Sequence, residues 1–409
     1  MASFVPTSMD RLTQLLEQRL QWVNANLPRG EPSFEQCCIF VKETSDKLGQ
    51  FTLQAPVRVK KIINGAFSSI GWDAARGKAV TRGLSMKKLA DCLEEILAEL
   101  SNFNVQPVAP TAAEIADIGK AGARMWELDH NRLTPGEDYE LDLQGEKNPN
   151  DHRDTADRPL FRSVDPKFLA RPTFTSFLKL LDNYTAEEGV REVVTKEEQD
   201  ENNAFLNLCL DTAVMQYAHK YLAAIKKVPE DREDFLKLLN QAWFGTYRRK
   251  VANDSSGFEH VFLGERETGK VVGLHNWLQL RNEELAGRLN YKGKIRPRRR
   301  LPAGYPRDQL VTIQFEWAGQ EKFISSSFVG TSPEFELALY SLCFFSGQEE
   351  TTVQLGPHRV NIKAFSIKQP GGPYIGTAFP EEAEHNDDEL NRAARVIQKP
   401  MIRRREGGR

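Results

Sequence analysis

Two histidines, His260 and His275, stand in apolar, strand-like runs that are separated by a short polar turn. A hairpin centred between Glu267 and Thr268 pairs the two histidines directly. Directly opposed residues of an antiparallel pair share one sheet face, with Cβ atoms about 4.5–5.5 Å apart. The spacing therefore predicts two imidazoles that reach one reacting group, provided that a bulge at a flanking glycine does not shift the register.

Such a pair suits cleavage of a phosphodiester that has a neighbouring 2′-hydroxyl. One neutral imidazole takes the hydroxyl proton, while one imidazolium protonates the departing 5′-oxygen. The phosphorane that forms between these steps carries extra negative charge, for which Lys322 is a candidate cation. A metal-dependent hydrolase with the histidines as ligands is the weaker alternative, because no carboxylate-bearing ligand motif accompanies them.

The composition is that of a globular protein with more than one structural unit. The chain has 409 residues, 40% of them hydrophobic, and 55 basic side chains nearly balance 57 acidic ones. Any nucleic-acid binding must then come from local basic patches. The start of the chain has no secretory pattern and no apolar run is long enough to span a bilayer, so we expect an intracellular protein without membrane contact.

The first part of the chain is predicted to be a helical domain of unknown role over residues 1–105. Apolar residues recur at helical spacing over 10–27 and again over 85–103. Two prolines without periodicity mark residues 106–111 as a linker, and the next helix is expected to be capped near Thr111.

Residues 112–380 show a pattern typical of an α+β domain. Helical periodicity covers 174–181, 203–227 and 231–250, and short β-rich runs such as 311–315 and 374–379 follow after Ser255. One helix interrupts them from Pro333 to about Phe345, with Ser332 at its N-cap. The charged residues 381–409 are expected to form a disordered tail.

Several ordered motifs resemble those of the EndoU (poly-U-specific endoribonuclease) family. The strings SGFEHVFLGE at 256–265 and GLHNW at 273–277 match its two histidine motifs. Further matches are NRLTPGEDYELDLQG at 131–145, LLDNY at 180–184, EVVTKEEQDENNAFL at 192–206, SSFVGTSPEFELALYSLCF at 326–344 and YIGTAFP at 374–380. The resemblance covers about residues 112–380 and implies an EndoU-like domain in which helices precede antiparallel sheets around a catalytic cleft.

The resemblance implies an enzyme that cleaves single-stranded RNA at uridylates by 2′-hydroxyl transesterification, leaving 2′,3′-cyclic phosphate and 5′-hydroxyl ends. It makes His260 and His275 the acid–base pair and Lys322 the third catalytic residue. Supporting roles, in orienting the imidazoles and presenting a backbone amide to the phosphate, fall to Glu259, Glu265 and Gly273. Substrate binding falls to Ser326, which is expected to read the uracil edge, and to Thr377 and Phe379.

Other expectations concern partners and cofactors. The basic segment 292–300 is expected to be a loop that holds the RNA backbone through Lys294, Arg296 and Arg298. The family resemblance implies manganese or calcium, in support of RNA binding or folding and not in the chemical step. DNA is not an expected partner, and cytoplasm is expected over nucleus. The sequence leaves the oligomeric state open.

One departure from the family pattern leaves an alternative function open. The family commonly has tyrosine where this chain has Phe379, so the aromatic face is kept and the hydroxyl is lost. An RNA-binding protein with weak or lost nuclease activity is therefore the second reading.

Overall fold

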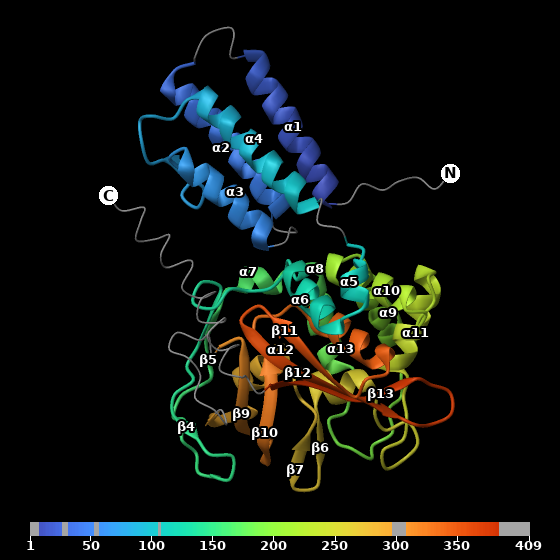
Figure 1. Cartoon of the computed structure of the whole chain (residues 1–409). Helices are drawn as coiled ribbons and strands as arrows, with labels where there is room; N and C mark the ends of the chain where they lie inside the picture. The colour runs from blue at the N-terminus through green and yellow to red at the C-terminus, as the bar shows by residue number, and fades with distance from the viewer. Residues whose placement is uncertain (1–7, 27–31, 53–56, 105–107, 297–307, 384–409) are drawn as a thin grey trace. The chain divides into compact units, whose positions relative to one another are not determined.

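The computed structural model describes residues 8–26, 32–52, 57–104, 108–296 and 308–383 (Figure 1). Contacts divide the chain into two compact units, Met1–Pro107 and Val108–Arg409. The division falls inside the segment 106–111, in which the sequence places a linker. No described helix is both long and apolar enough to cross a membrane.

The first unit, drawn in blue in Figure 1, consists of helices that carry a small hairpin. Its elements are α1 (Ser8–Asn26), α2 (Phe34–Thr52), α3 (Val57–Ser69), β1 (Trp72–Asp73), β2 (Lys78–Ala79) and α4 (Met86–Asn104). The helices predicted over 10–27 and 85–103 are confirmed as α1 and α4. Their apolar stripes meet in one core, which contains Leu16, Leu89 and Ile96.

The second unit begins with the expected cap. The Thr111 side chain accepts from the backbone N–H of Glu114, whose side chain returns to Thr111, and this capping box starts the first helix. The helices that follow are α5 (Ala112–Ile115), α6 (Ile118–Leu128), α7 (Pro166–Leu169), α8 (Pro172–Lys179), α9 (Lys196–Leu210), α10 (Ala213–Ala224) and α11 (Arg232–Phe244).

Two predicted helix boundaries are wrong for local reasons. The segment 203–227 is not one helix, because Thr212 leaves the helical conformation and caps α10 with its side chain. The helix predicted over 231–250 ends at Phe244, where Gly245 takes an extended conformation. A Cβ at Gly245 would lie 2.4 Å from the carbonyl oxygen of Gln241, so a side chain is not accommodated there.

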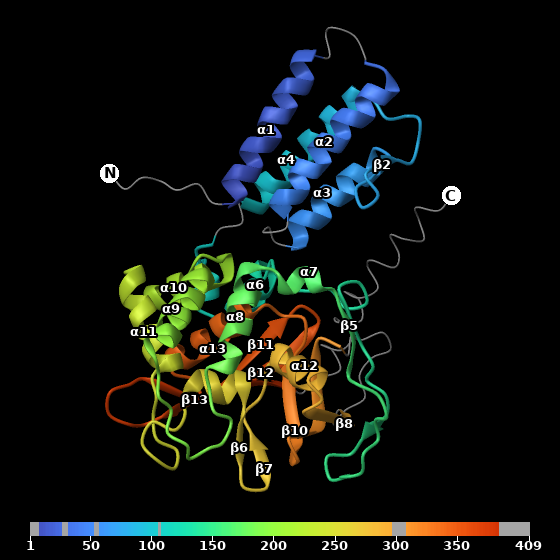
Figure 2. The ribbon, with the colours of Figure 1, turned by 180° about the vertical axis from the view of Figure 1, so that it is seen from behind.

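Two sheets follow the helices, in keeping with an α+β fold (Figures 1 and 2). The larger has the strand order β4-β8-β9-β10-β7-β6 and is mixed, because β10 pairs with β7 in parallel and β4 with β8 in parallel. Its strands are β4 (Glu146–Lys147), β6 (Glu265–Glu267), β7 (Lys270–Val272), β8 (Leu289–Ile295), β9 (Leu310–Trp317) and β10 (Gln320–Phe328).

The smaller sheet is antiparallel and packs against a buried helix. Its strands are β11 (Glu350–Leu355), β12 (His358–Ile367) and β13 (Tyr374–Glu382), and a separate pair joins β3 (Tyr139–Leu141) to β5 (Phe161–Val164). Helix α13 (Pro333–Ser346) contacts β12 and β13, as the neighbouring orange ribbons of Figure 1 indicate. Ser332 caps α13 and Pro333 occupies its first turn, as predicted.

Two predictions about charged segments need correction. Glu381 and Glu382 belong to β13 and pair with β12, so the tail does not begin at 381; its remainder, 384–409, lies outside the described residues. The basic segment 292–300 is not wholly a loop, because residues up to Ile295 belong to β8. Helix α12 (Trp277–Leu285) precedes that strand.

Candidate active site

His260 lies on a helical turn and not on a strand, which corrects the hairpin prediction. Glu259–Leu263 form a π-helical turn, closed by the Gly264 N–H donating to the Glu259 carbonyl at 2.8 Å. The hairpin that follows pairs Glu267 with Lys270, so it is centred one residue later than predicted. His260 precedes this hairpin and His275 follows it.

The two histidine segments are nevertheless joined directly through their backbones. The Leu274 N–H donates to the His260 carbonyl at 3.0 Å, and the His275 N–H donates to the Val261 carbonyl at 2.9 Å. Two adjacent peptide bonds therefore fix the approach of the imidazoles, in place of the cross-strand pairing expected from the sequence.

Gly273 makes this approach possible. Its φ is +64°, and a Cβ there would lie 1.8 Å from the His260 carbonyl oxygen, which no rearrangement of a side chain can relieve. Only glycine combines this left-handed backbone with so close a neighbour. The sequence assigned Gly273 an amide contact to phosphate, and the structure gives it a second task as the point of contact between the histidine segments.

One ring nitrogen of His275 is hydrogen-bonded to the protein backbone. Its Nδ1 lies 3.0 Å from the carbonyl oxygen of Ser326 on β10. A carbonyl can only accept, so Nδ1 carries the proton and Nε2 is left with its lone pair. The Phe379 ring on β13 stacks on the imidazole, with centroids 4.7 Å apart and an interplanar angle of 17°. One face of Phe379 is thus already covered by His275.

His260 is oriented by a carboxylate. Its Nδ1 lies 2.5 Å from Glu265 Oε2, so Glu265 orients this imidazole as the sequence suggested. The same oxygen lies 3.4 Å from Arg249 Nε, and Arg249 also donates to the carbonyl of Gly376 on β13 at 2.5 Å. Arg249 stands in an undistinguished basic run, and sequence analysis did not single it out.

Lys322 completes the cluster. It lies on β10, where the pairing with β9 is irregular between Lys322 and Ser325, and its Nζ donates to the Gly273 carbonyl at 2.8 Å. Burial, aided by the positive charge of Lys270, lowers the pKa of Lys322 to about 8. The ammonium is thus largely charged at neutral pH and lies against the glycine that joins the two histidine segments.

Burial sets the charge of the imidazoles. It lowers the pKa of His260 well below its ordinary value, and the positive charges of Arg249 and Lys322 lower it further. Burial also lowers the pKa of His275, with Lys322 acting in the same direction and the Ser326 carbonyl opposing it. Both rings are neutral at neutral pH in the free protein, and a bound anion would favour protonation of one of them.

Glu259 lacks the contact with an imidazole that was expected of it, whereas Ser326 is hydrogen-bonded to a neighbouring strand. Both carboxyl oxygens of Glu259 are buried and have no hydrogen-bond partner in the described structure, and burial raises the pKa of Glu259 to about 10. It therefore carries a proton and does not orient either imidazole. The hydroxyl of Ser326 lies 2.9 Å from that of Thr312. Thr377 and Phe379 are both half-buried and alternate on β13, so they share one strand face.

The expected phosphate-binding cations are not brought together. Lys294 is buried within β8, a position that does not favour contact with an RNA backbone. Arg296 is exposed, and its Nε lies 3.9 Å from Glu146. Arg298 lies outside the described residues. The imidazoles, Lys322 and β13 form the cluster.

Comparison with known proteins decides the family. The family model for the endoribonuclease XendoU matches residues 117–380, which include every residue of the cluster. The chain belongs to the XendoU endoribonuclease family. The resemblance seen in the motifs of residues 112–380 is therefore confirmed, and residues 1–116 lie outside the matched region.

Relatives within the XendoU family cover most of the second unit. The poly(U)-specific endoribonuclease of Xenopus tropicalis is 40% identical over 286 residues, 67% of this chain and 96% of the relative. The uridylate-specific endoribonuclease of Homo sapiens is 35% identical over 305 residues, 72% of each chain. A solved structure of XendoU, described as a splicing-independent snoRNA processing endoribonuclease, is 40% identical, has a TM-score of 0.58, and aligns with 66% of this chain and 98% of that one.

The donor groups do not fit a resident metal centre. Among the described residues, no group of three or more histidine, cysteine, aspartate or glutamate side chains is placed to hold a metal ion. The nearest carboxylate to His260, Glu265, is occupied by that imidazole and by Arg249. Manganese or calcium, expected from the XendoU-type motifs, is thus not assigned to any described residue.

Replacing Gly273 by alanine tests the collision of a Cβ with the His260 carbonyl oxygen, and a control glycine gives the cost of a positive φ alone. Gly269→Ala is the matched control, because its φ is also positive, at +81°, but nothing lies within 4 Å of its Cβ. We expect Gly269→Ala to cost about 1 kcal/mol and Gly273→Ala at least about 3 kcal/mol. Urea unfolding followed by tryptophan fluorescence measures both, and equal costs would contradict the close approach.

Proposed function

We propose that this chain is an endoribonuclease that cuts single-stranded RNA at uridylates by transesterification. The observation that carries the proposal is the cluster in which His260 and His275 each commit Nδ1 to the protein, beside the ammonium of Lys322. Each imidazole therefore has its Nε2 left for the substrate. Two such nitrogens and one cation are what an in-line attack on phosphorus requires.

The reaction follows from these assignments. One Nε2 accepts the proton of the 2′-hydroxyl as its oxygen bonds to phosphorus, and the other imidazole, as an imidazolium, donates a proton to the 5′-oxygen as its bond to phosphorus breaks. The products are a 2′,3′-cyclic phosphate and a 5′-hydroxyl. Lys322 lies where it can offset the charge that develops on the non-bridging oxygens.

Substrate binding favours uptake from solvent of the proton that the second imidazole needs. In the free protein the burial of both rings and the nearby cations favour the neutral forms. A phosphodiester placed between them adds a negative charge, which raises the pKa of whichever imidazole lies nearer the leaving oxygen. Acid and base are thus distinguished by the substrate, and Glu265, whose own pKa burial raises to about 7, holds Nδ1 of His260.

The preference for uridylate rests on the relatives. Relatives that are 40% and 35% identical to this chain are named poly(U)-specific and uridylate-specific endoribonucleases. We assign the reading of the uracil edge to Ser326 and contacts with the nucleoside to Thr377 and Phe379. The stacking of Phe379 on His275 supports this placement, because a base against this face of β13 would lie beside the reacting groups.

The first prediction about the reaction concerns the attacking hydroxyl. A single 2′-deoxyuridine at the cleavage position should block cleavage, because the nucleophile is gone. His260→Ala and His275→Ala should each lower the cleavage rate by about 10²- to 10⁴-fold. His219→Ala is the control, since His219 stacks on Phe235 away from the cluster and should leave the rate unchanged.

Mass analysis of the cleavage products checks the end chemistry of the same reaction. Cleavage of the deoxy-substituted oligonucleotide would refute this mechanism. Equal, negligible cleavage by wild type and His260→Ala, with RNA retained on a filter, would favour the alternative of an RNA-binding protein without nuclease activity.

The second prediction concerns pH. The pKa of Lys322 is lowered to about 8, so its charge is lost as pH rises through that value, and kcat/KM should fall about fivefold between pH 8 and pH 9. Lys322→Arg, which stays charged, should cut more slowly but lose less of its activity over this range. Lys270→Gln removes a positive neighbour and should move the fall to higher pH. An alkaline limb at the same pH in all three proteins would assign it to another group.

The third prediction concerns metal. We assign manganese, or calcium, to RNA binding or folding, so excess chelator should raise KM and leave the single-turnover rate at saturating RNA within about twofold. Cleavage of an oligouridylate at several RNA concentrations, with and without chelator, measures both quantities. Loss of cleavage at saturating RNA, restored by manganese alone, would place the metal in the chemical step.

A further inference from the structure

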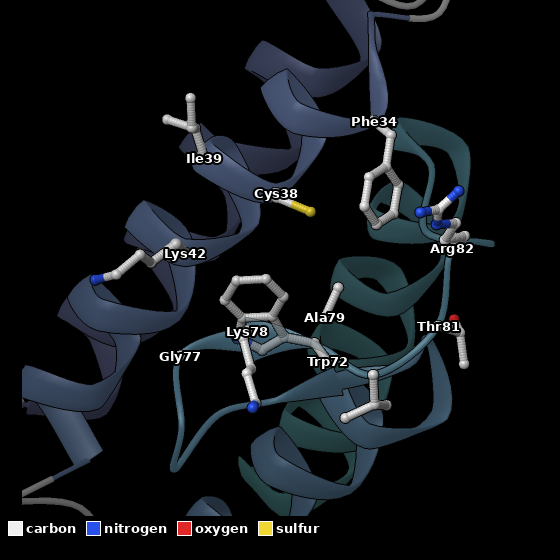
Figure 3. Close-up of a pocket in the computed structure, with 11 residues that line it drawn as sticks. Phe34, Cys38, Ile39, Lys42, Trp72, Gly77, Lys78, Ala79, Thr81 and Arg82 are labelled. Carbon is white, nitrogen blue, oxygen red and sulfur yellow. The ribbon is translucent and has the colours of Figure 1, made fainter.

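A groove in the first unit lies between α2 and the β1–β2 hairpin (Figure 3). We call it the α2 groove. It has a volume of about 500 Å³. Phe34, Cys38 and Ile39 line it from α2, and Trp72, Ala79 and Val80 from the hairpin side. This unit lies outside the XendoU match, so the catalytic cluster does not account for the groove.

The α2 groove is lined by apolar side chains that are exposed to solvent. Ile39 is 60% exposed, Val80 is 59% exposed and Phe34 is 37% exposed, and all three face the same hollow. Among the described residues of this unit, Trp22 is the only other large apolar side chain that is exposed, and it stacks on Phe40. A single cluster of exposed apolar side chains is typical of a binding surface.

Every charged side chain that lines the α2 groove is basic. Lys42 comes from α2, and Lys78 and Arg82 come from the hairpin and the segment after it. Figure 3 shows Lys42 and Lys78 near one end of the hollow and Arg82 beside Phe34 near the other. Lys42 is paired with Asp46 at 2.6 Å, whereas Lys78 and Arg82 are exposed and carry no ion pair among the described residues.

The floor of the groove holds an unused donor. Trp72 is buried, and its indole nitrogen has no hydrogen-bond partner in the described structure. Figure 3 places this indole between α2 and the hairpin, below Cys38. Because this nitrogen is itself buried, recognition of an occupant must come from the exposed side chains that line the groove.

We propose that the α2 groove binds a short acidic, amphipathic segment of a partner protein. Its apolar side chains would cover Ile39 and Val80, and its carboxylates would meet Lys78 and Arg82 at the two ends. Apolar anchors surrounded by complementary charge are the usual composition of such a site. RNA fits the groove less well, because its exposed walls are largely aliphatic and the Trp72 ring is too buried for a base to stack on it.

The test uses the full chain and a displayed library of random twelve-residue peptides. Selection is carried out with an excess of the soluble double variant Ile39→Glu/Val80→Glu, which removes peptides that bind elsewhere. We expect the retained peptides to be net acidic and to contain leucine, isoleucine or phenylalanine. A labelled peptide from this set should bind at least tenfold more weakly to Val80→Glu and to Lys78→Glu in anisotropy titrations.

The control variant is Val193→Glu, which changes an exposed valine of the second unit and should leave peptide binding unchanged. Circular dichroism checks that each variant keeps its fold, and all variants should cut an oligouridylate as wild type does. Peptide binding and RNA cleavage are thus measured separately, so either proposal can be contradicted without the other.

Three results would overturn the proposal. The first is a selection that yields only basic peptides, or none that depends on the groove. The second is a loss of oligouridylate binding or cleavage in Lys78→Glu, which would make the groove an RNA site. The third is a wild-type dimer in sedimentation that Val80→Glu dissociates, which would make the occupant a second copy of this chain.

Discussion

The catalytic cluster depends on one close approach, that of the backbone at Gly273 to the carbonyl of His260. Two consecutive hydrogen bonds, from the N–H groups of Leu274 and His275, hold the histidine segments together. The Gly273 carbonyl in turn receives the Lys322 ammonium. Two adjacent peptide units therefore set the relative positions of two imidazoles and one cation. Backbone atoms have no rotamers, so this arrangement is more rigid than one built from side chains alone.

Burial then determines how these groups are charged. Burial keeps both imidazoles neutral, and the positive charges of Arg249 and Lys322 beside His260, and of Lys322 beside His275, act in the same direction. The carboxylate of Glu265 and the carbonyl of Ser326 hold the two Nδ1 protons without neutralising Lys322. The free site is thus electropositive and short of one proton, which suits a phosphodiester that brings the negative charge needed to retain that proton.

The sequence predicted which residues meet in the cluster more accurately than it predicted the backbone conformation around them. The helices α1, α4 and α13 could be predicted, because the apolar periodicity of α1 and α4 and the N-cap of α13 are local signals. The strand expected at His260 was wrong, since the apolar run around it packs as a helical turn. Phe258 and Phe262 stand four residues apart, which is helical spacing, and their rings pack 5.0 Å apart in one aromatic cluster. The four-residue spacing of Phe258 and Phe262 favours a helix, but the β-rich composition of the surrounding residues favoured a strand.

Features that depend on distant segments could not be read from the sequence. Arg249 reaches both Glu265 and the carbonyl of Gly376, and only the folded chain brings these groups together. The two contacts link the strand that carries Phe379 to the carboxylate that orients His260, so the strand facing the nucleoside and the acid–base pair share one support. A shift of β13 on substrate binding would therefore reach His260 through Arg249.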